Sequence, residues 1–273
     1  MTLMSIIACR IFEDEIVHLI KNDSQITRIL VVDSLDAAGI LRKLSENNID
    51  HTVCSPNDIE DLMHNEQDTN DTNYCILVNI LGFSLDASPQ LLKESVYKEI
   101  SIMSVYADTI LVFYGLCGNV LGNLNRDFAH LSCPVHILRE EDGEIIDDCI
   151  GASLGGREPY LKALKETGGE GVYFLTPMGA AFWKEMAVIA RLTNDPDNTV
   201  MTKIVFDYAG YKNVGKINTG LVYEESFDAK VEEFAQAFDF RIVDMQGTIR
   251  IAEQSYQRAK DSITKKRADL NEI

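Results

Sequence analysis

No apolar run in this sequence is long enough to cross a membrane, because every hydrophobic stretch is shorter than the roughly 18 residues that a membrane-spanning helix needs. The first run, Leu3 to Ala8, has no basic residue before it, and the charged Arg10 and Glu13 follow it closely. A secretory signal has a basic start and a longer apolar core. We therefore expect a cytoplasmic protein whose first apolar segment is a buried strand.

Basic residues are scarce. The chain has 25 lysines and arginines against 43 aspartates and glutamates, which gives a formal net charge of −18. A surface this acidic repels nucleic-acid phosphates and anionic lipid headgroups. We therefore expect no nucleic-acid partner and no membrane surface, and we interpret the charge as favouring solubility.

Signatures of several enzyme classes are missing as well. No Gly-x-Gly-x-x-Gly follows the first expected strand, and neither a complete phosphate-loop motif nor His-Glu-x-x-His occurs. We expect neither nucleotide-dependent nor serine-hydrolase chemistry. The six cysteines are far apart in 273 residues, unlike those of a small secreted disulfide scaffold, so in a reducing cytoplasm they are thiols or metal ligands.

Short β-rich apolar runs alternate with amphipathic stretches along the whole chain, and 46% of the residues are hydrophobic. This pattern predicts an α/β protein with a mostly parallel, Rossmann-like sheet and flanking helices. Two lobes around a cleft are expected, residues 1–140 and 141–273, with one compact domain as the alternative. The expected strands are Ser5–Ala8, Ile29–Val32, Thr52–Cys54, Cys75–Ile80, Thr109–Tyr114, Val135–Leu138, Val172–Leu175, Lys203–Phe206, Lys216–Val222 and Arg241–Val243.

Helices are expected between these strands, and a polar loop is expected over residues 66–73. In the second half the helices are Ile150–Glu166, Gly179–Leu192, Phe227–Phe238 and Thr248–Lys266. The segment Val200–Tyr208 is ambiguous, because it reads as a helix as well as a strand.

Three cysteines stand where ligands bind in parallel sheets, outside the carboxyl ends of the strands. Cys9 follows the first strand, and Cys117 lies three residues after Tyr114. Cys149 precedes an expected helix, whose dipole favours a thiolate. Three thiolates fit zinc with an open fourth position, or an iron–sulfur cluster with one iron available to substrate. The alternative is three unrelated cysteines near a core, as we expect for Cys54, Cys75 and Cys133.

Residues next to these thiols are further candidates. Gly115 and Gly118 allow the backbone to approach a cofactor closely, and Asp148 precedes Cys149 directly. Arg157 and Asn119 are expected to orient a small anionic or methylated substrate. Glu13 is a candidate for acid/base chemistry, although its simpler role is in the first turn of a helix.

Several segments, taken together, resemble a family of archaeal and bacterial proteins catalogued as a domain of unknown function. The segments are Ala8-Cys9 with Glu13–Glu15, Tyr114–Asn119, Asp148–Ile150, Gly156–Tyr160 and Tyr173–Pro177. Members are common in methanogens, often beside genes for corrinoid-dependent methyltransferases. The resemblance implies a cytoplasmic α/β protein connected with one-carbon metabolism.

The first hypothesis is a metal-binding protein that holds zinc or an iron–sulfur cluster through Cys9, Cys117 and Cys149. It would act on a small-molecule ligand as an enzyme or accessory factor of methyl transfer. The alternative is a non-catalytic binding module for a corrinoid, a methylated compound, a corrinoid protein or a partner methyltransferase. A structural partner that docks a basic enzyme through its acidic surface ranks third.

Overall fold

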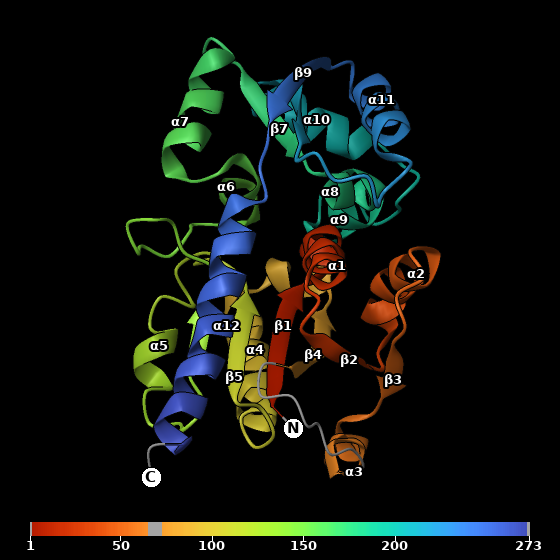
Figure 1. Cartoon of the computed structure of the whole chain (residues 1–273). Coiled ribbons are helices and arrows are strands. Elements are labelled where there is room, and N and C mark those ends of the chain that lie inside the picture. The colour runs from red at the N-terminus through yellow and green to blue at the C-terminus, as the bar shows by residue number, and fades with distance from the viewer. Residues whose placement is uncertain (1, 65–72, 272–273) are drawn as a thin grey trace.

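The computed structural model describes residues 2–64 and 73–271, so all but the last residue of the loop expected over residues 66–73, and the end of the helix expected before it, lie outside the described residues. The chain forms two parallel sheets with flanking helices, the larger in the lower half of Figure 1 and the smaller in the upper half. The predicted α/β class and parallel pairing are confirmed.

The larger sheet has six parallel strands in the order β3-β2-β4-β1-β5-β6. These are β1 (Leu3–Cys9), β2 (Ile26–Val32), β3 (Thr52–Cys54), β4 (Tyr74–Leu81), β5 (Thr109–Phe113) and β6 (Val135–Ile137). β1 is central and buried throughout, which explains why all its residues except Ser5 are apolar. Its neighbours β4 and β5 run beside it in register along almost their full lengths.

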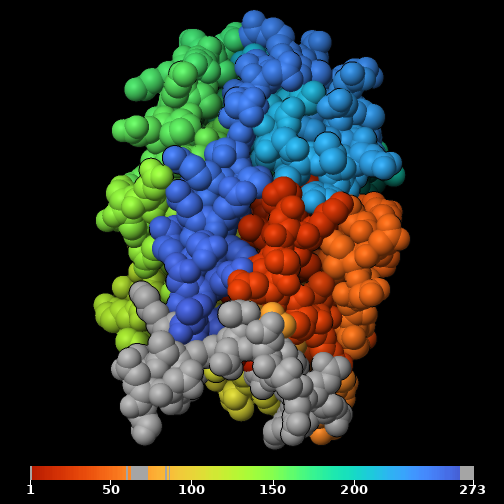
Figure 2. All heavy atoms as spheres, viewed as in Figure 1, coloured from red at the N-terminus to blue at the C-terminus, as the bar shows by residue number. Residues whose placement is uncertain are grey.

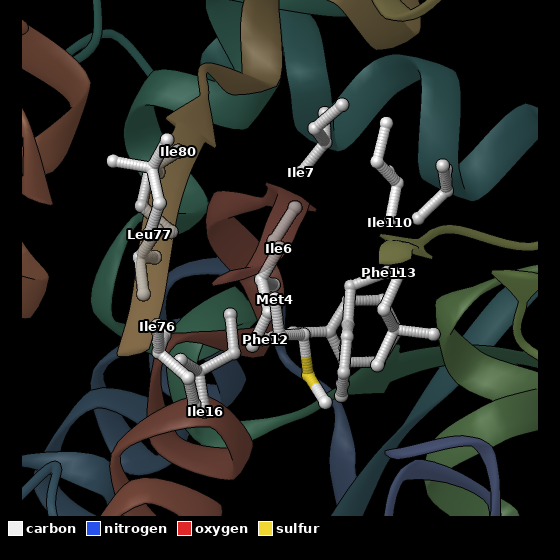
Figure 3. Close-up of a cluster of buried hydrophobic side chains, with 14 of the residues drawn as sticks. Met4, Ile6, Ile7, Phe12, Ile16, Ile76, Leu77, Ile80, Ile110 and Phe113 are labelled. Carbon is white, nitrogen blue, oxygen red and sulfur yellow. The ribbon is translucent and has the colours of Figure 1, made fainter. Parts of the chain in front are cut away.

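Helices cover both faces of this sheet. They are α1 (Glu13–Asn22), α2 (Ala38–Glu46), α3 (Ile59–His64), α4 (Pro89–Met103), the short α5 (Leu124–Asp127) and the last helix, α12 (Arg250–Asn271). Short 3₁₀ turns lead into several of them: η1 (Arg10–Phe12), η2 (Leu35–Ala37), η3 (Pro56–Asp58) and η4 (Phe83–Ala87). Figure 3 shows the apolar interior, where Met4 and Ile6 of β1 lie between Ile76 of β4, Phe113 of β5 and Ile16 of α1.

The smaller sheet has three parallel strands in the order β7-β8-β9: β7 (Gly171–Leu175), β8 (Tyr211–Asn218) and β9 (Arg241–Gln246). The helices α6 (Cys149–Leu154) and α7 (Arg157–Glu166) share one apolar core with it. A second, aromatic core joins it to the opposite group of helices, which comprises α8 (Pro177–Ala181), α9 (Trp183–Ile189), α10 (Val200–Tyr208) and α11 (Phe227–Phe238).

The last helix belongs to the larger sheet by its contacts. α12 starts near α6 and runs down across β5 and β6, beside α1 (Figures 1 and 2). Its Tyr256 donates to Asp23 at 3.0 Å, and Lys260 donates to the same carboxylate at 2.6 Å. The chain therefore passes into the smaller unit near residue 140 and returns from it after β9.

Four expected elements of the second half differ from the structure. Lys203–Phe206 is not a strand, because α10 spans Val200–Tyr208. The helix expected over Ile150–Glu166 is divided at Gly155 and Gly156, whose φ angles of +94° and +123° end α6 in a left-handed cap. The helix expected over Gly179–Leu192 is likewise two short helices, α8 and α9. The strand expected over Lys216–Val222 is displaced, since β8 begins at Tyr211 directly after Gly210 ends the preceding turn.

Candidate functional site

The three predicted thiols line one cavity, of about 250 Å³, at the carboxyl ends of β1 and β5. The rest of its wall combines apolar side chains, glycine backbone and one carboxylate. Its lining residues are Cys9, Phe12, Pro89, Leu92, Tyr114, Gly115, Cys117, Gly118, Asp148 and Cys149. All three candidate ligands and all three residues expected beside a cofactor are therefore in the same place.

Cys9 is the last residue of β1 and is only 3% exposed. The chain turns directly after it into η1, which puts Phe12 on the same cavity wall. Phe12 packs edge-on against Phe113 of β5, with ring centroids 5.5 Å apart. Because the turn is anchored by this aromatic contact in the core, the Cys9 thiol has a fixed position at the sheet edge.

Cys117 lies in a backbone conformation that side-chain-bearing residues seldom adopt. Its φ angle is +45°, and Gly118 and Asn119 follow at +73° and +65°. A left-handed conformation costs a residue other than glycine about 1–3 kcal/mol, and such residues gather at functional sites. A glycine at position 117 would avoid this strain, so the strained backbone at this thiol marks the loop as a candidate site.

Gly115 allows a second loop to reach the cavity. A Cβ atom at this position would lie 2.4 Å from the Ile146 carbonyl oxygen, too close for any side chain. The loop is held by two backbone bonds: the Leu116 N–H donates to Ile146 at 2.8 Å, and the Cys117 N–H donates to Asp147 at 2.9 Å. This pairing brings the residues that follow, Asp148 and Cys149, onto the same wall as Cys117.

Asp148 and Cys149 begin α6. The Asp148 side chain caps the helix by accepting from the Gly151 N–H at 2.7 Å. Burial raises the pKa of the Asp148 carboxyl above its usual range. The helix is only six residues long, so the dipole expected to favour a Cys149 thiolate is smaller than for the long helix that the sequence suggested.

The cavity wall favours positive charge in its occupant. Among the described residues that line it are three thiols and one carboxylate, and none is a lysine, arginine or histidine. An anionic ligand would meet no countercharge there, whereas thiolates formed in the cavity would need a cation. Within residues 2–64 and 73–271, however, no group of three or more His, Cys, Asp or Glu side chains is already placed to hold a metal ion.

The residues expected to act on substrate lie elsewhere. Arg157 pairs with Glu140 at 2.7 Å and Asp142 at 3.0 Å, and it borders a separate surface depression. Asn119 follows the cavity loop but does not line the cavity. Glu13 is fully buried on α1, where Arg10 donates to it at 3.1 Å.

A buried group of charges near Glu13 was missed by the sequence reasoning. Lys43 of α2 has no exposed surface, and its ammonium contacts Asp14 at 2.5 Å, Glu13 at 3.2 Å and Glu224 at 3.8 Å. Desolvation raises the pKa of Glu15, also buried, to about 8. The three consecutive acids were visible in the sequence, but the period of α2 gave no sign that its lysine turns inward.

A Gly-x-Ser-x-Gly pattern is present at Gly151–Gly155, although no serine-hydrolase signature was expected. In serine hydrolases the serine stands on a sharp turn between a strand and a helix. Here Ser153 lies within α6, is 3% exposed and donates to the Cys149 carbonyl at 2.9 Å. The pattern therefore gives no support to serine-hydrolase chemistry.

The remaining cysteines are separate from the cavity. All six lie in the described part of the chain, and none forms a disulfide. Cys54, Cys75 and Cys133 are buried, as expected for small apolar side chains. Only the three thiols at the sheet edge share a space with one another.

Comparison with known proteins gives a family and no activity. The model of the family described as a protein of unknown function (DUF1638) matches residues 80–256, a range that includes Cys117 and Cys149 and begins after Cys9. No curated protein and no solved structure matches this chain. None of the described helices has the length and apolarity to span a membrane. The chain belongs to the DUF1638 family, whose function is unknown.

Proposed function

We propose that this protein binds a metal centre through Cys9, Cys117 and Cys149, and that the centre is an iron–sulfur cluster in preference to a zinc ion. One observation carries the proposal: three thiols from distant parts of the chain line a single cavity that contains a carboxylate and no basic lining residue. Iron–sulfur clusters are held by cysteine thiolates and carry the positive iron that such a wall requires.

The size of the cavity supports the cluster. Its volume is about 250 Å³, whereas one water molecule takes up about 30 Å³. A single zinc ion would leave most of this space to solvent or substrate. A group of several iron and sulfide atoms fills more of it, and the apolar side chains of Phe12 and Leu92 suit the sulfide faces of such a group.

A mononuclear zinc site makes stricter demands on the positions of its ligands. Around one zinc ion, Zn–S bonds of about 2.3 Å place the sulfurs about 4 Å apart. No group of three potential ligands in the described residues is already arranged to hold a metal ion. The thiolates of a cluster bind different irons, so they need less convergence.

Three thiolates would leave one iron of a four-iron cluster without a cysteine ligand. That iron is open to a small molecule, for which it would act as a Lewis acid, or the cluster would carry an electron. Asp148 lines the same cavity, so its carboxylate would be the protein group available to bind that iron. Methyl transfer in one-carbon metabolism, the context suggested by the sequence resemblance, is one use of such a centre.

A corrinoid partner is a weaker proposal. The cavity lies below the range of about 300–1,000 Å³ that is usual for sites of drug-sized ligands, and a corrinoid macrocycle is larger than these ligands. A corrinoid protein or partner methyltransferase would therefore have to dock outside the cavity. No contact in the described residues favours this alternative over the metal centre.

The test is metal analysis of protein purified without oxygen and then incubated with ferrous iron and sulfide. We expect stoichiometric iron and sulfide, a brown chromophore, and loss of both in Cys117→Ser and Cys149→Ser. Cys133→Ser is the matched control, because Cys133 is buried away from the cavity. Uptake of zinc alone would show that the site binds one zinc ion and not an iron–sulfur cluster. Protein that takes up neither metal, or equal uptake by all the variants, would refute the proposal.

A further inference from the structure

Helix α10 is apolar on two opposite sides. Its inner side carries Thr202 and Phe206, which are buried, and Phe206 packs against Phe238 with ring centroids 5.0 Å apart. Its outer side carries five apolar side chains that are between 39% and 95% exposed: Val200, Met201, Ile204, Val205 and Tyr208. A helix that carries apolar residues on two sides normally has both sides covered, and here only the inner side is covered within the described part of the chain.

The five outer residues form one continuous stripe. Their positions repeat after four and eight residues, so with about 3.6 residues per turn they lie along one face of the helix. Elsewhere the most exposed large apolar side chains, such as Leu35, Val105 and Val222, stand singly in the sequence. Single exposed apolar residues need no explanation, whereas a contiguous apolar patch marks an interaction surface.

We infer that α10 is the contact helix of a homodimer, in which the stripe packs against the stripe of a second copy in antiparallel orientation. This inference does not depend on the proposed metal centre.

The area fits such a dimer. Tyr208 is 95% exposed, and an aromatic side chain presents about 150–250 Å². With the four aliphatic residues, the stripe presents roughly 500 Å², which is large for a monomer surface. Two stripes facing each other bury about 1,000 Å², the lower limit for a specific interface. The pairing therefore needs no further surface to reach the size of a weak, specific dimer.

Charge does not oppose a second copy at this stripe. Lys203 and Asp207, on one flank of α10, are engaged within the chain, because Lys203 donates to the Phe238 carbonyl oxygen at 2.9 Å and Asp207 accepts from Lys212 at 3.1 Å. A two-fold axis perpendicular to the helix at Ile204 pairs the two stripes and reverses their direction. The stripe itself holds no charge, so the contact brings no acidic side chains face to face despite the net charge of −18.

The experiment is sedimentation velocity of the full chain over a range of concentrations at low and high salt. We expect a dimer that strengthens with added salt, because salt screens the repulsion between two acidic chains. Ile204→Lys puts a charge at the centre of the stripe in both copies. It should raise the dimer dissociation constant at least about 100-fold, as for loss of a hot spot on each side.

Val105→Lys is the matched control. Val105 is 75% exposed just after the end of α4, and its substitution makes the same change in charge and polarity. It should leave the dimer intact. Tyr208→Lys is the second stripe variant, and circular dichroism verifies the fold of each protein. A wild-type chain that stays monomeric at all concentrations overturns the inference. So does a dimer that survives Ile204→Lys, or one that weakens equally in Val105→Lys.

Discussion

Replacement of Cys117 by glycine should stabilise the fold while it removes a ligand. The residue has a φ angle of +45°, and the left-handed conformation costs a residue with a Cβ about 1–2 kcal/mol. Glycine avoids that cost but loses about 0.5–1 kcal/mol more chain entropy on folding. Cys117→Ala keeps the strain and also lacks the thiol. We therefore expect Cys117→Gly to be more stable than Cys117→Ala by about 0.5–1 kcal/mol.

The assay is denaturant unfolding of the two variants after removal of metal, with metal uptake measured in parallel. For a chain of this size 1 kcal/mol corresponds to about 2–4 °C in Tm, so thermal unfolding gives a second reading. Cys149 supplies the control, because it occupies the first turn of α6 in the helical conformation. There the sign should reverse, and Cys149→Gly should be less stable than Cys149→Ala by up to about 1 kcal/mol.

Two results would refute the reasoning about Cys117. Equal stability of the glycine and alanine variants would mean that the left-handed conformation carries no cost. The backbone conformation of Cys117 would then give no support to a functional role. A more stable Cys117→Gly protein that binds metal as well as the wild type would leave the strain real but remove Cys117 from the ligand set.

Three further perturbations have definite signs. Gly115→Ala should destabilise the chain by about 1–3 kcal/mol and weaken metal uptake, both read on the same samples, because its Cβ would lie 2.4 Å from the Ile146 carbonyl oxygen. Lys43→Met should cost about 3–5 kcal/mol in denaturant unfolding, because it removes the buried cation beside Asp14 and leaves Glu13 with Arg10 alone. Adding Glu13→Gln and Asp14→Asn should recover much of the loss, and no recovery would contradict the pairing. Burial raises the pKa of Glu15 from 4.5 to about 8. Between these pH values the folded chain holds a proton that the unfolded chain has released. The free energy of unfolding should therefore fall by up to about 1.4 kcal/mol per pH unit as the pH rises from 4.5 to 8. Glu15→Gln should flatten that part of the curve of unfolding free energy against pH, and an unchanged slope would exclude a raised pKa.

The fold and the meeting of the thiols were predictable for the same reason. Parallel strands end at one edge of their sheet, so Cys9 after β1 and Cys117 after β5 were expected at the same edge, and they lie near each other because β1 and β5 are adjacent in the sheet. Cys149 could be added because it opens a helix. None of these steps needed a contact between distant side chains, since the topology of the backbone supplied the proximity.

The errors came where local pattern and tertiary context disagree. The segment that forms α10 is rich in β-branched residues, which favour strands, yet it folds as a helix whose Phe206 is buried in an aromatic core. Arg157 carries the charge suited to an anionic substrate, but Glu140 and Asp142 from an earlier loop already bind it. Sequence spacing holds no information about such long-range partners.

Glu13 shows most clearly why closeness in sequence misleads. It lies four residues after Cys9, which made it a candidate for chemistry at the thiol site. Between them the chain makes one 3₁₀ turn, in which successive side chains point in different directions around the axis. Cys9 and Phe12 therefore line the cavity, whereas Arg10 stacks over the Phe182 ring at 3.8 Å and pairs with Glu13 on the side of the smaller sheet. One turn thus joins the thiol cavity to the contact between the two sheets, and Glu13 belongs to that contact.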